Sequence, residues 1–377
     1  MITVRQATLV DRPAIFTFIR SVYENRWQYK IPERWEWEFV NNPYLESRSL
    51  PVWIAVDEDG RVVGQTCALV EPVKIGDRLC RLGWSVDTYL LREYRGQGLG
   101  FQLQKANDEG NPIFMSLSMT SANRRIKAGL GSVPLEPVAE FRRLIRYEPE
   151  SIRAAAARRL EGNHSRLRKA VQAFFRWTLV DRILSAGLNL WLDARDLRKI
   201  PAPDPEVAVT PVAAFGPEID TLWDKVSPHF YAIIQRDQAY LNWKYGSQPH
   251  VMYIKCIARK NQEVSGYIIL RVGKPPERKV GIIADIFVEP KDRATLRALL
   301  AFALRYFKTE RVKDVVAATT VKEYQACLLE LGFKLSGEAV PMFHSKLEGM
   351  DVAAITQPGA WFFSKGDHDW DQFPLSR

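Results

Sequence analysis

One short stretch of the chain, residues 90–100, combines a positive charge with three glycines at alternate positions. Arg95 is followed directly by Gly96, and Gly98 and Gly100 come next. Apolar residues on either side predict a strand before the stretch and a helix after it. Glycines at a helix start leave backbone N–H groups uncovered, and these groups and the helix dipole both favour an anion. The stretch therefore predicts a site for a diphosphate.

The spacing of the glycines separates this stretch from two other phosphate-binding patterns. A dinucleotide-binding turn has its third glycine one residue later, where Phe101 stands, and a P-loop ends in Lys-Ser or Lys-Thr, which do not follow here. The remaining pattern, Arg-x-x-Gly-x-Gly over Arg95, Gly98 and Gly100, resembles the coenzyme A diphosphate loop of the GNAT superfamily of N-acetyltransferases. The alternative is a glycine-rich turn beside a chance arginine.

The elements expected around this stretch follow one another as they do in a GNAT domain. Apolar and alternating runs predict strands at residues 2–5, 52–56, 62–70, 79–89 and 112–117, and helices after Thr8 or Asp11, after Gly98 and at residues 121–130. Tight turns are expected at Asp59-Gly60 and Gly76-Asp77. GNAT domains run strand, helix, three antiparallel strands, helix, strand, helix. The resemblance therefore covers residues 1–147 and implies an α/β fold with a mixed sheet.

The same order of elements recurs in the second half of the chain. Four anchors match in order: Trp37 with Trp243, Gly64 with Gly266, Asp87 with Asp285, and Arg95 with Arg293. The alternative is that aromatic segments and glycine turns align by chance, but the last two anchors keep the same spacing in both copies. We therefore expect two GNAT-like domains, residues 1–147 and 206–377. Residues 148–205 would form a basic helical connector and a proline-rich linker.

The two copies differ where the diphosphate would bind. Leu296 and Ala298 stand in the second copy where Gly98 and Gly100 stand in the first, and Asp292 adds a repelling charge. Side chains at these positions would keep a phosphate away from the backbone amides. We therefore predict a degenerate second copy, with coenzyme A bound only by the first.

The resemblance implies acetyl-coenzyme A as co-substrate and direct attack of an amine on its thioester. Family members often carry an acidic base where Asp87 stands; the alternative, that Asp87 only bonds a neighbouring backbone amide, is favoured by Asp285 in the second copy. A tyrosine that often protonates the thiolate is missing from residues 123–127, which leaves Tyr89 as the candidate. The residues expected to bind the coenzyme are Leu90, Leu91, Arg95, Gly96, Gln97, Gly98, Leu99, Gly100, Ser121 and Asn123.

The acceptor groove of GNAT proteins lies after the first helix, where aromatic and acidic residues alternate here. Such residues could stack on a sugar ring and hold an ammonium group. The alternative is that Trp35, Trp37 and Phe39 belong to the core and the acids point outward from a strand-like segment. The acceptor candidates are Glu33, Glu36 and Glu38.

The resulting expectation is an N-acyltransferase that acetylates a primary amine of a small acceptor, such as an amino sugar. The alternative from another class is a non-catalytic acyl-coenzyme A-binding module, or a scaffold that docks to a membrane or a partner. The four cysteines show no C-x-x-C spacing, and the first residues show no signal-peptide pattern. Buried thiols in a reducing, cytoplasmic setting are expected. The acids and histidine of residues 367–371 are interpreted as a turn after the last strand, and no metal site is expected.

The net charge of +9 is concentrated in one segment. Residues 141–200 hold fourteen Arg and Lys against six Asp and Glu, a balance of +8 (14 − 6). Helices are expected at residues 151–160 and 165–192, and charges within the second exclude a membrane span. Three roles remain open for residues 151–200: a connector with solvated arginines, an interfacial helix on anionic lipid, or nucleic-acid binding, which ranks last because no base-reading motif accompanies the charge.

Overall fold

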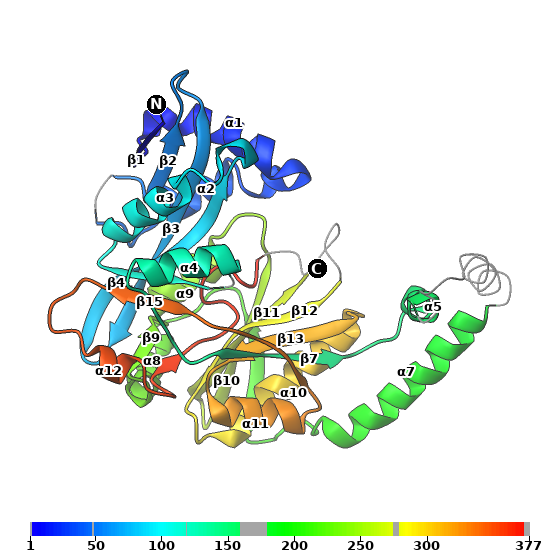
Figure 1. Ribbon diagram of the computed structural model, residues 1–377. Coiled ribbons are helices and arrows are strands. Elements are labelled where there is room, and N and C mark those ends of the chain that lie inside the picture. The colour runs from blue at the N-terminus through cyan, green and yellow to red at the C-terminus, as the bar shows by residue number, and fades with distance from the viewer. Residues whose placement is uncertain (1, 47–48, 118, 159–178, 274–278, 373–377) are drawn as a thin grey trace.

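The computed structural model describes residues 2–46, 49–117, 119–158, 179–273 and 279–372. Within these residues the chain forms two mixed β-sheets with helices packed against them, as Figure 1 shows. The first sheet is built mainly from blue and cyan strands and is completed by green β9 and by β15 and β16 near the red end of the colour range, and the second sheet is mainly yellow and orange. The predicted α/β fold with mixed sheets is confirmed.

The first sheet has the strand order β1-β2-β3-β4-β5-β15-β6, and β9 and β16 extend it beside β3. Its strands are β1 (Thr3–Gln6), β2 (Val52–Val56), β3 (Val62–Ile75), β4 (Arg78–Leu90), β5 (Ile113–Ser116), β6 (Val133–Pro134), β9 (Ala232–Ile234), β15 (Met342–Ser345) and β16 (Trp361–Phe362). The helices of this domain are α1 (Arg12–Val22), α2 (Glu33–Phe39), α3 (Leu99–Glu109) and α4 (Ser121–Gly129). The strands and helices expected from the sequence are all present, with ends that differ by a few residues.

The segment of alternating aromatics and acids is a helix, α2, and the strand-like alternative is wrong. Trp35, Trp37 and Phe39 are buried, which confirms that they belong to the core. Glu38 is buried as well, because α2 is enclosed on more than one side and Glu38 pairs with Arg34 one helical turn away.

The second sheet has the strand order β14-β7-β13-β12-β11-β10-β8. Its strands are β7 (Val138–Leu144), β8 (Val207–Val212), β10 (Tyr253–Lys260), β11 (Glu263–Val272), β12 (Gly281–Val288), β13 (Asp314–Thr319) and β14 (Lys334–Ala339). Its helices are α8 (Glu218–Val226), α9 (Gln238–Gly246), α10 (Arg293–Thr309) and α11 (Lys322–Glu330), and the short α12 (Val352–Ile355) follows later in the chain. The element order in this domain parallels that of the first.

The two domains exchange a strand. Strand β7 leaves the first domain after α4 and pairs with β13 of the second sheet. Strand β15 leaves the second domain and pairs with β5 of the first sheet. A boundary at residue 147 therefore does not separate the two sheets, because the first sheet contains β9, β15 and β16 from beyond it and the second contains β7 from before it.

In both sheets the two central parallel strands separate before they end. The parallel pairing of β4 with β5 stops at Trp84 and Met115, although β4 continues to Leu90. In the second sheet, the parallel pairing of β12 with β13 stops at Ile282 and Val316, although β12 continues. Each sheet is therefore split between its two central parallel strands.

A pair of glycines has the same surroundings in the two sheets. Gly64 lies opposite Leu90, and Gly266 lies opposite Val288. A Cβ atom added at either glycine would lie 2.7 Å from the side chain of the facing residue. The same Cβ atom would lie 3.2 Å from the helix that follows each central strand, at Leu103 of α3 or at Thr295 of α10, so both glycines sit where strand and helix pack closely.

Helices α2 and α9 bring matching tryptophans together where the domains meet. The rings of Trp37 and Trp243 stack with centroids 4.8 Å apart and an interplanar angle of 18°. Nearby, buried Glu71 accepts hydrogen bonds from Tyr240 at 3.0 Å and Lys244 at 2.5 Å.

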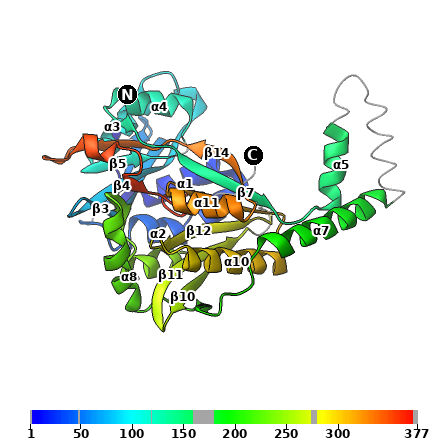
Figure 2. The ribbon, with the colours of Figure 1, turned by 90° about the horizontal axis from the view of Figure 1, so that it is seen from below.

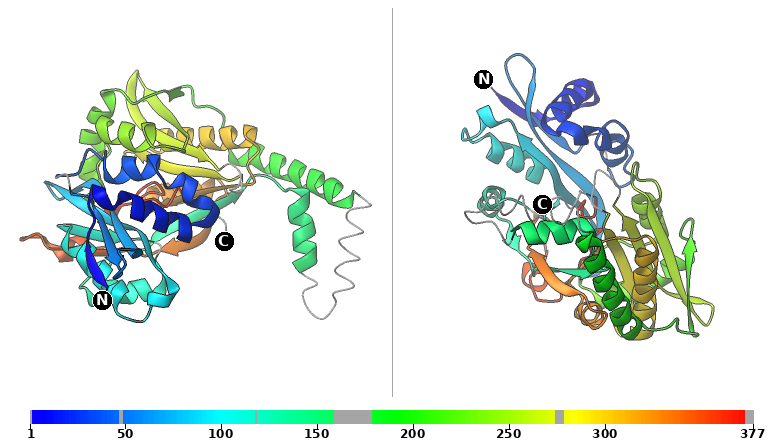
Figure 3. Two further views of the ribbon diagram at one scale, coloured as in Figure 1. Left: turned by 90° about the horizontal axis from the view of Figure 1, so that it is seen from above. Right: turned by 90° about the vertical axis from the view of Figure 1, so that its right-hand side faces the viewer.

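Helices α5 (Pro149–Arg158) and α7 (Val180–Lys199) form an arm that projects from the two domains, as Figures 1, 2 and 3 show from different sides. The helix expected at residues 165–192 lies partly outside the described residues, and α7 extends beyond its expected end. Among the described residues, no helix is both long enough and apolar enough to cross a bilayer.

Candidate functional site

The glycine-rich turn leaves a row of backbone donors unpaired at the start of α3. Gly98 is the N-cap residue, with a left-handed φ of 78°, and no side chain caps the helix. Within the described part of the chain, the five N–H groups of residues 96–100 find no hydrogen-bond acceptor. A Cβ atom added at Gly96 or Gly98 would meet nothing within 4 Å, so the space beside these amides is open. An anion could approach this backbone directly.

Arg95 and Tyr89 connect this turn to the end of β4. The Arg95 side chain is exposed and donates a hydrogen bond from Nε to the Leu90 carbonyl at 3.0 Å. Its guanidinium carbon lies 5.6 Å from the centre of the Tyr89 ring, which holds the positive charge beside the turn. In the described structure the Tyr89 hydroxyl has no hydrogen-bond partner.

The other predicted coenzyme ligands lie on both sides of the split in the first sheet. The Leu91 N–H already donates to the Val63 carbonyl at 3.0 Å. Ser121 and Asn123 are in the first turn of α4, where Thr120 caps the helix by accepting from the Asn123 N–H. Ser121 is exposed and Asn123 is half-buried, so both side chains remain accessible.

Asp87 stands at a β-bulge in β4, with a left-handed φ of 49°. The register between β3 and β4 shifts at this point. Oδ1 of Asp87 accepts a hydrogen bond from the Tyr23 hydroxyl at 3.2 Å and pairs with the Lys30 ammonium, and the Lys30 and Asp87 side chains are each only 6% exposed. The carboxylate is therefore held by two protein donors rather than by a neighbouring backbone amide.

The end of the described chain runs into the same region. His368 and Asp369 form a buried ion pair, and His368 Nε2 lies 3.2 Å from the Ser85 carbonyl of β4. Burial by itself lowers the pKa of His368, but the Asp369 carboxylate outweighs it and raises the pKa above the ordinary value. Arg34 lies between Glu38 at 3.2 Å and Asp369 at 4.0 Å.

Sequence reasoning missed this buried cluster. The turn expected at residues 367–371 after the last strand is present, but the burial of its acids and histidine was not predicted. The concentration of charge in residues 367–371 was the only local signal, and nothing in it indicates a partner far earlier in the chain. No group of three or more His, Cys, Asp or Glu side chains in the described residues is placed to hold a metal ion.

The three predicted acceptor residues each face a basic side chain of the protein. Glu36 pairs with Arg12 at 2.8 Å, Glu33 lies 3.4 Å from His250, and Glu38 pairs with Arg34. Glu33 is exposed and Glu36 is half-buried, whereas Glu38 is buried and burial raises its pKa. An acceptor ammonium would have to displace an existing partner at any of the three.

The ion pair at the bulge has a counterpart in the second domain. Arg236 Nε lies 3.1 Å from Asp285, and the Tyr267 hydroxyl donates to the same carboxylate at 2.8 Å. Arg236 precedes Trp243 by the same number of residues as Lys30 precedes Trp37. A buried cation on an aspartate of the central strand is thus common to both domains.

The turn before α10 occupies the place in the second domain that the glycine-rich turn occupies in the first, but a side chain caps its helix. Asp292 caps α10 by accepting from the Thr295 N–H at 3.1 Å, and Leu296 is buried. Arg293, the counterpart of Arg95, pairs with Glu330 at 2.8 Å.

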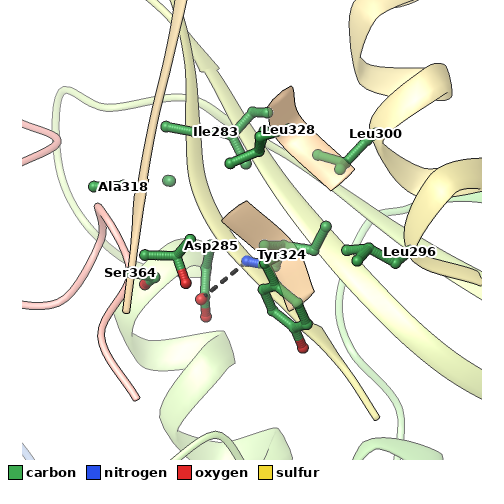
Figure 4. A pocket seen from close by; sticks show the side chains of 12 residues that line it. Ile283, Asp285, Leu296, Leu300, Ala318, Tyr324, Leu328 and Ser364 are labelled. Carbon is green, nitrogen blue, oxygen red and sulfur yellow. Dashed lines mark hydrogen bonds between the residues drawn. The ribbon is translucent and has the colours of Figure 1, made fainter. Parts of the chain in front are cut away.

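The split in the second sheet is filled by the chain itself. The Val288 N–H donates to the Tyr324 hydroxyl at 2.8 Å, and the Gly366 N–H donates to the Ala284 carbonyl at 2.6 Å. What remains is a cavity of about 10 Å³, room for roughly one water molecule. Figure 4 shows its lining, which includes Ile283, Asp285, Leu296, Leu300, Ala318, Tyr324, Leu328 and Ser364.

The fold is that of the GCN5-related N-acetyltransferases, and the match to solved structures extends over both domains. The N-acetyltransferase of this class from Anabaena variabilis matches with a TM-score of 0.56 and 11% identity, over 92% of this chain and 73% of that one. A probable N-acyltransferase from Enterococcus faecalis matches with a TM-score of 0.57 and 11% identity, over 90% and 72% of the two chains.

A third match is Saccharomyces cerevisiae N-myristoyltransferase with bound myristoyl-CoA, with a TM-score of 0.55 and 8% identity, over 91% of this chain and 82% of that one. No protein-family model and no curated protein matches the sequence. The likeness at these identities is one of fold.

Proposed function

We propose that the chain is an acyltransferase that moves an acyl group from a coenzyme A thioester to a primary amine. The observation that carries the proposal is the row of unpaired N–H groups at residues 96–100, with Arg95 beside it. Unpaired donors at a helix start, open space and a fixed cation together suit a diphosphate. The proposal is supported by the fold, since the solved neighbours are N-acetyltransferases and an N-myristoyltransferase.

The coenzyme would bind in the first domain only, and the second would be a degenerate copy of it. This part of the proposal is supported by the equivalent glycines and ion pairs of the two sheets, and by the stacked tryptophans where the domains meet. It is also supported by Asp292, which covers the second helix start, and by Tyr324, which occupies the second split.

The diphosphate would lie on the N–H groups of residues 96–100, and Ser121 and Asn123 would contact the pantetheine arm. Asp87 enters the proposal as a positioning residue, because its carboxylate is already held and the same ion pair recurs beside the filled split. Tyr89 is the proposed proton donor to the thiolate, since its hydroxyl has no partner in the described structure and its ring lies under Arg95.

The proposed acceptor is a small amine, with amino sugars as the first class to examine. The test is a calorimetric titration with coenzyme A, followed by a free-thiol release assay with acetyl-coenzyme A and myristoyl-coenzyme A against a panel of amines that includes amino sugars. Thiol release that depends on an amine is expected. Failure to bind coenzyme A would contradict the proposal, and binding without turnover on any amine would favour a non-catalytic acyl-coenzyme A-binding module.

A further inference from the structure

The arm helix α7 buries its polar face and exposes its apolar face. An amphipathic helix ordinarily packs its apolar face against the protein and leaves its polar face in water. In α7 the inward face is mainly polar: Asp181, Ser185 and Asp196 are buried on it, together with Leu192. The outward face instead carries large apolar side chains, which are Ile183, Leu184, Leu188, Leu190, Trp191 and Leu197.

The inward orientation is fixed by specific polar contacts. Asp181 lies 3.0 Å from Arg153 of α5, and Asp196 lies 2.7 Å from Arg143 of β7. The Asn189 side chain both accepts from the Tyr147 N–H and donates to the Tyr147 carbonyl. Rotating the helix to bury its apolar face would break these bonds and leave the buried Arg143 without its carboxylate, which is costly. The apolar face is therefore held outward.

This outward face is both large and strongly exposed. Leu190 is 70% exposed, Leu197 is 86% exposed and Trp191 is 60% exposed. Contiguous apolar surface of this kind on a folded protein marks an interaction site. Figures 1 and 3 show that α7 runs outward from the second domain, away from the first sheet.

The charged side chains near the apolar face of α7 indicate what kind of partner it binds. Arg182, Arg198 and Lys199 are exposed on α7. Of the acids in this helix, two are buried, and the third, Asp193, pairs with Lys308 at 2.7 Å. Exposed cations at both ends of an apolar stripe suit an anionic lipid surface, where the stripe enters the acyl boundary and the cations meet headgroups. Two copies of the same basic face would repel each other.

We propose that α7 lays its apolar face on an anionic membrane surface and so anchors the protein peripherally. The full chain should co-sediment with vesicles of phosphatidylcholine mixed with phosphatidylglycerol, more strongly at low than at high salt, and weakly with phosphatidylcholine alone. The variant Leu190→Gln/Leu197→Gln should lower partition into the mixed vesicles by about tenfold or more, because removing two leucine side chains from the lipid removes more burial energy than a tenfold change requires.

The matched control is Val10→Gln/Met252→Gln, which alters two side chains that are 88% and 67% exposed elsewhere on the surface. This variant should bind vesicles as the unaltered chain does, and both variants should keep the same unfolding free energy. Lack of binding by the unaltered chain, or equal binding by the α7 variant, would overturn the proposal. A dimer in solution that the α7 variant dissociates would also overturn it, since a second copy would then cover the face.

Discussion

Replacing Gly98 by alanine tests whether bare backbone donors hold the coenzyme. The added Cβ would meet no protein atom within 4 Å, so the variant introduces no clash. Its cost to folding comes from the left-handed φ of 78°, which disfavours alanine by about 1–2 kcal/mol. The new methyl group would occupy the space beside the amides of residues 96–100. Losing even one charge-assisted hydrogen bond there costs about 1.5–3 kcal/mol, which lowers coenzyme A affinity by about 10-fold to 150-fold.

The hairpin turn between β2 and β3 provides the control. Gly60 has a φ of 77°, and a Cβ atom added there also meets nothing within 4 Å. Gly60→Ala should therefore lose as much unfolding free energy in urea as Gly98→Ala. Calorimetric titration with coenzyme A should give weaker binding for Gly98→Ala alone. Equal coenzyme affinity in the two variants would refute the assignment of the diphosphate to this turn.

Three other substitutions examine the split and the buried cluster. Asp87→Asn should lower the unfolding free energy by about 3–5 kcal/mol, because its buried lysine partner loses its counterion; unchanged stability with reduced turnover would instead indicate a base. Since the pKa of His368 is raised in the folded state, the ion pair with Asp369 should stabilise fully below about pH 6.5 and lose its effect as pH rises through the raised pKa. The stability lost in His368→Gln, measured in urea, should therefore shrink with rising pH, and growth would contradict this. Tyr324→Phe leaves the Val288 N–H without its acceptor and should cost about 1–3 kcal/mol in urea unfolding; equal stability would argue against that bond.

Local patterns predicted the first sheet well because its strands and turns carry their own signals. The strand at residues 52–56 is β2, and the turns at Gly60 and Gly76 have the left-handed φ that glycine permits. The glycine-rich turn was predictable for the same reason. The N–H groups of residues 96–100 lie in a turn whose three glycines are all within those five residues, so the signal for it is local.

The sequence of α2 did not reveal that this segment is a helix rather than a strand. Trp35, Trp37 and Phe39 alternate with glutamates, which is the pattern of a strand with one buried face. The helix satisfies the same residues because it is enclosed on more than one side, so that even Glu38 is buried. Reading secondary structure from the spacing of apolar residues assumes that one face of the element is exposed to solvent. That assumption fails for α2, which lies where the two domains meet.

The buried ion pairs depend on partners far apart in sequence. Lys30 and Asp87 come from different elements, and His368 reaches β4 from the other end of the chain. Each of these residues alone is an ordinary charged side chain. Their burial follows from the assembled fold, which no local pattern contains.

The strand exchange affects how the chain can be made. While a ribosome synthesises the protein, β5 emerges long before β15, the strand that pairs with it. Until β15 is complete, the edge of β5 stays open to pairing with any other strand, which invites aggregation. The N-terminal half released by itself should therefore be a poor folding unit, because a strand translated much later, β15, completes the sheet that was begun first.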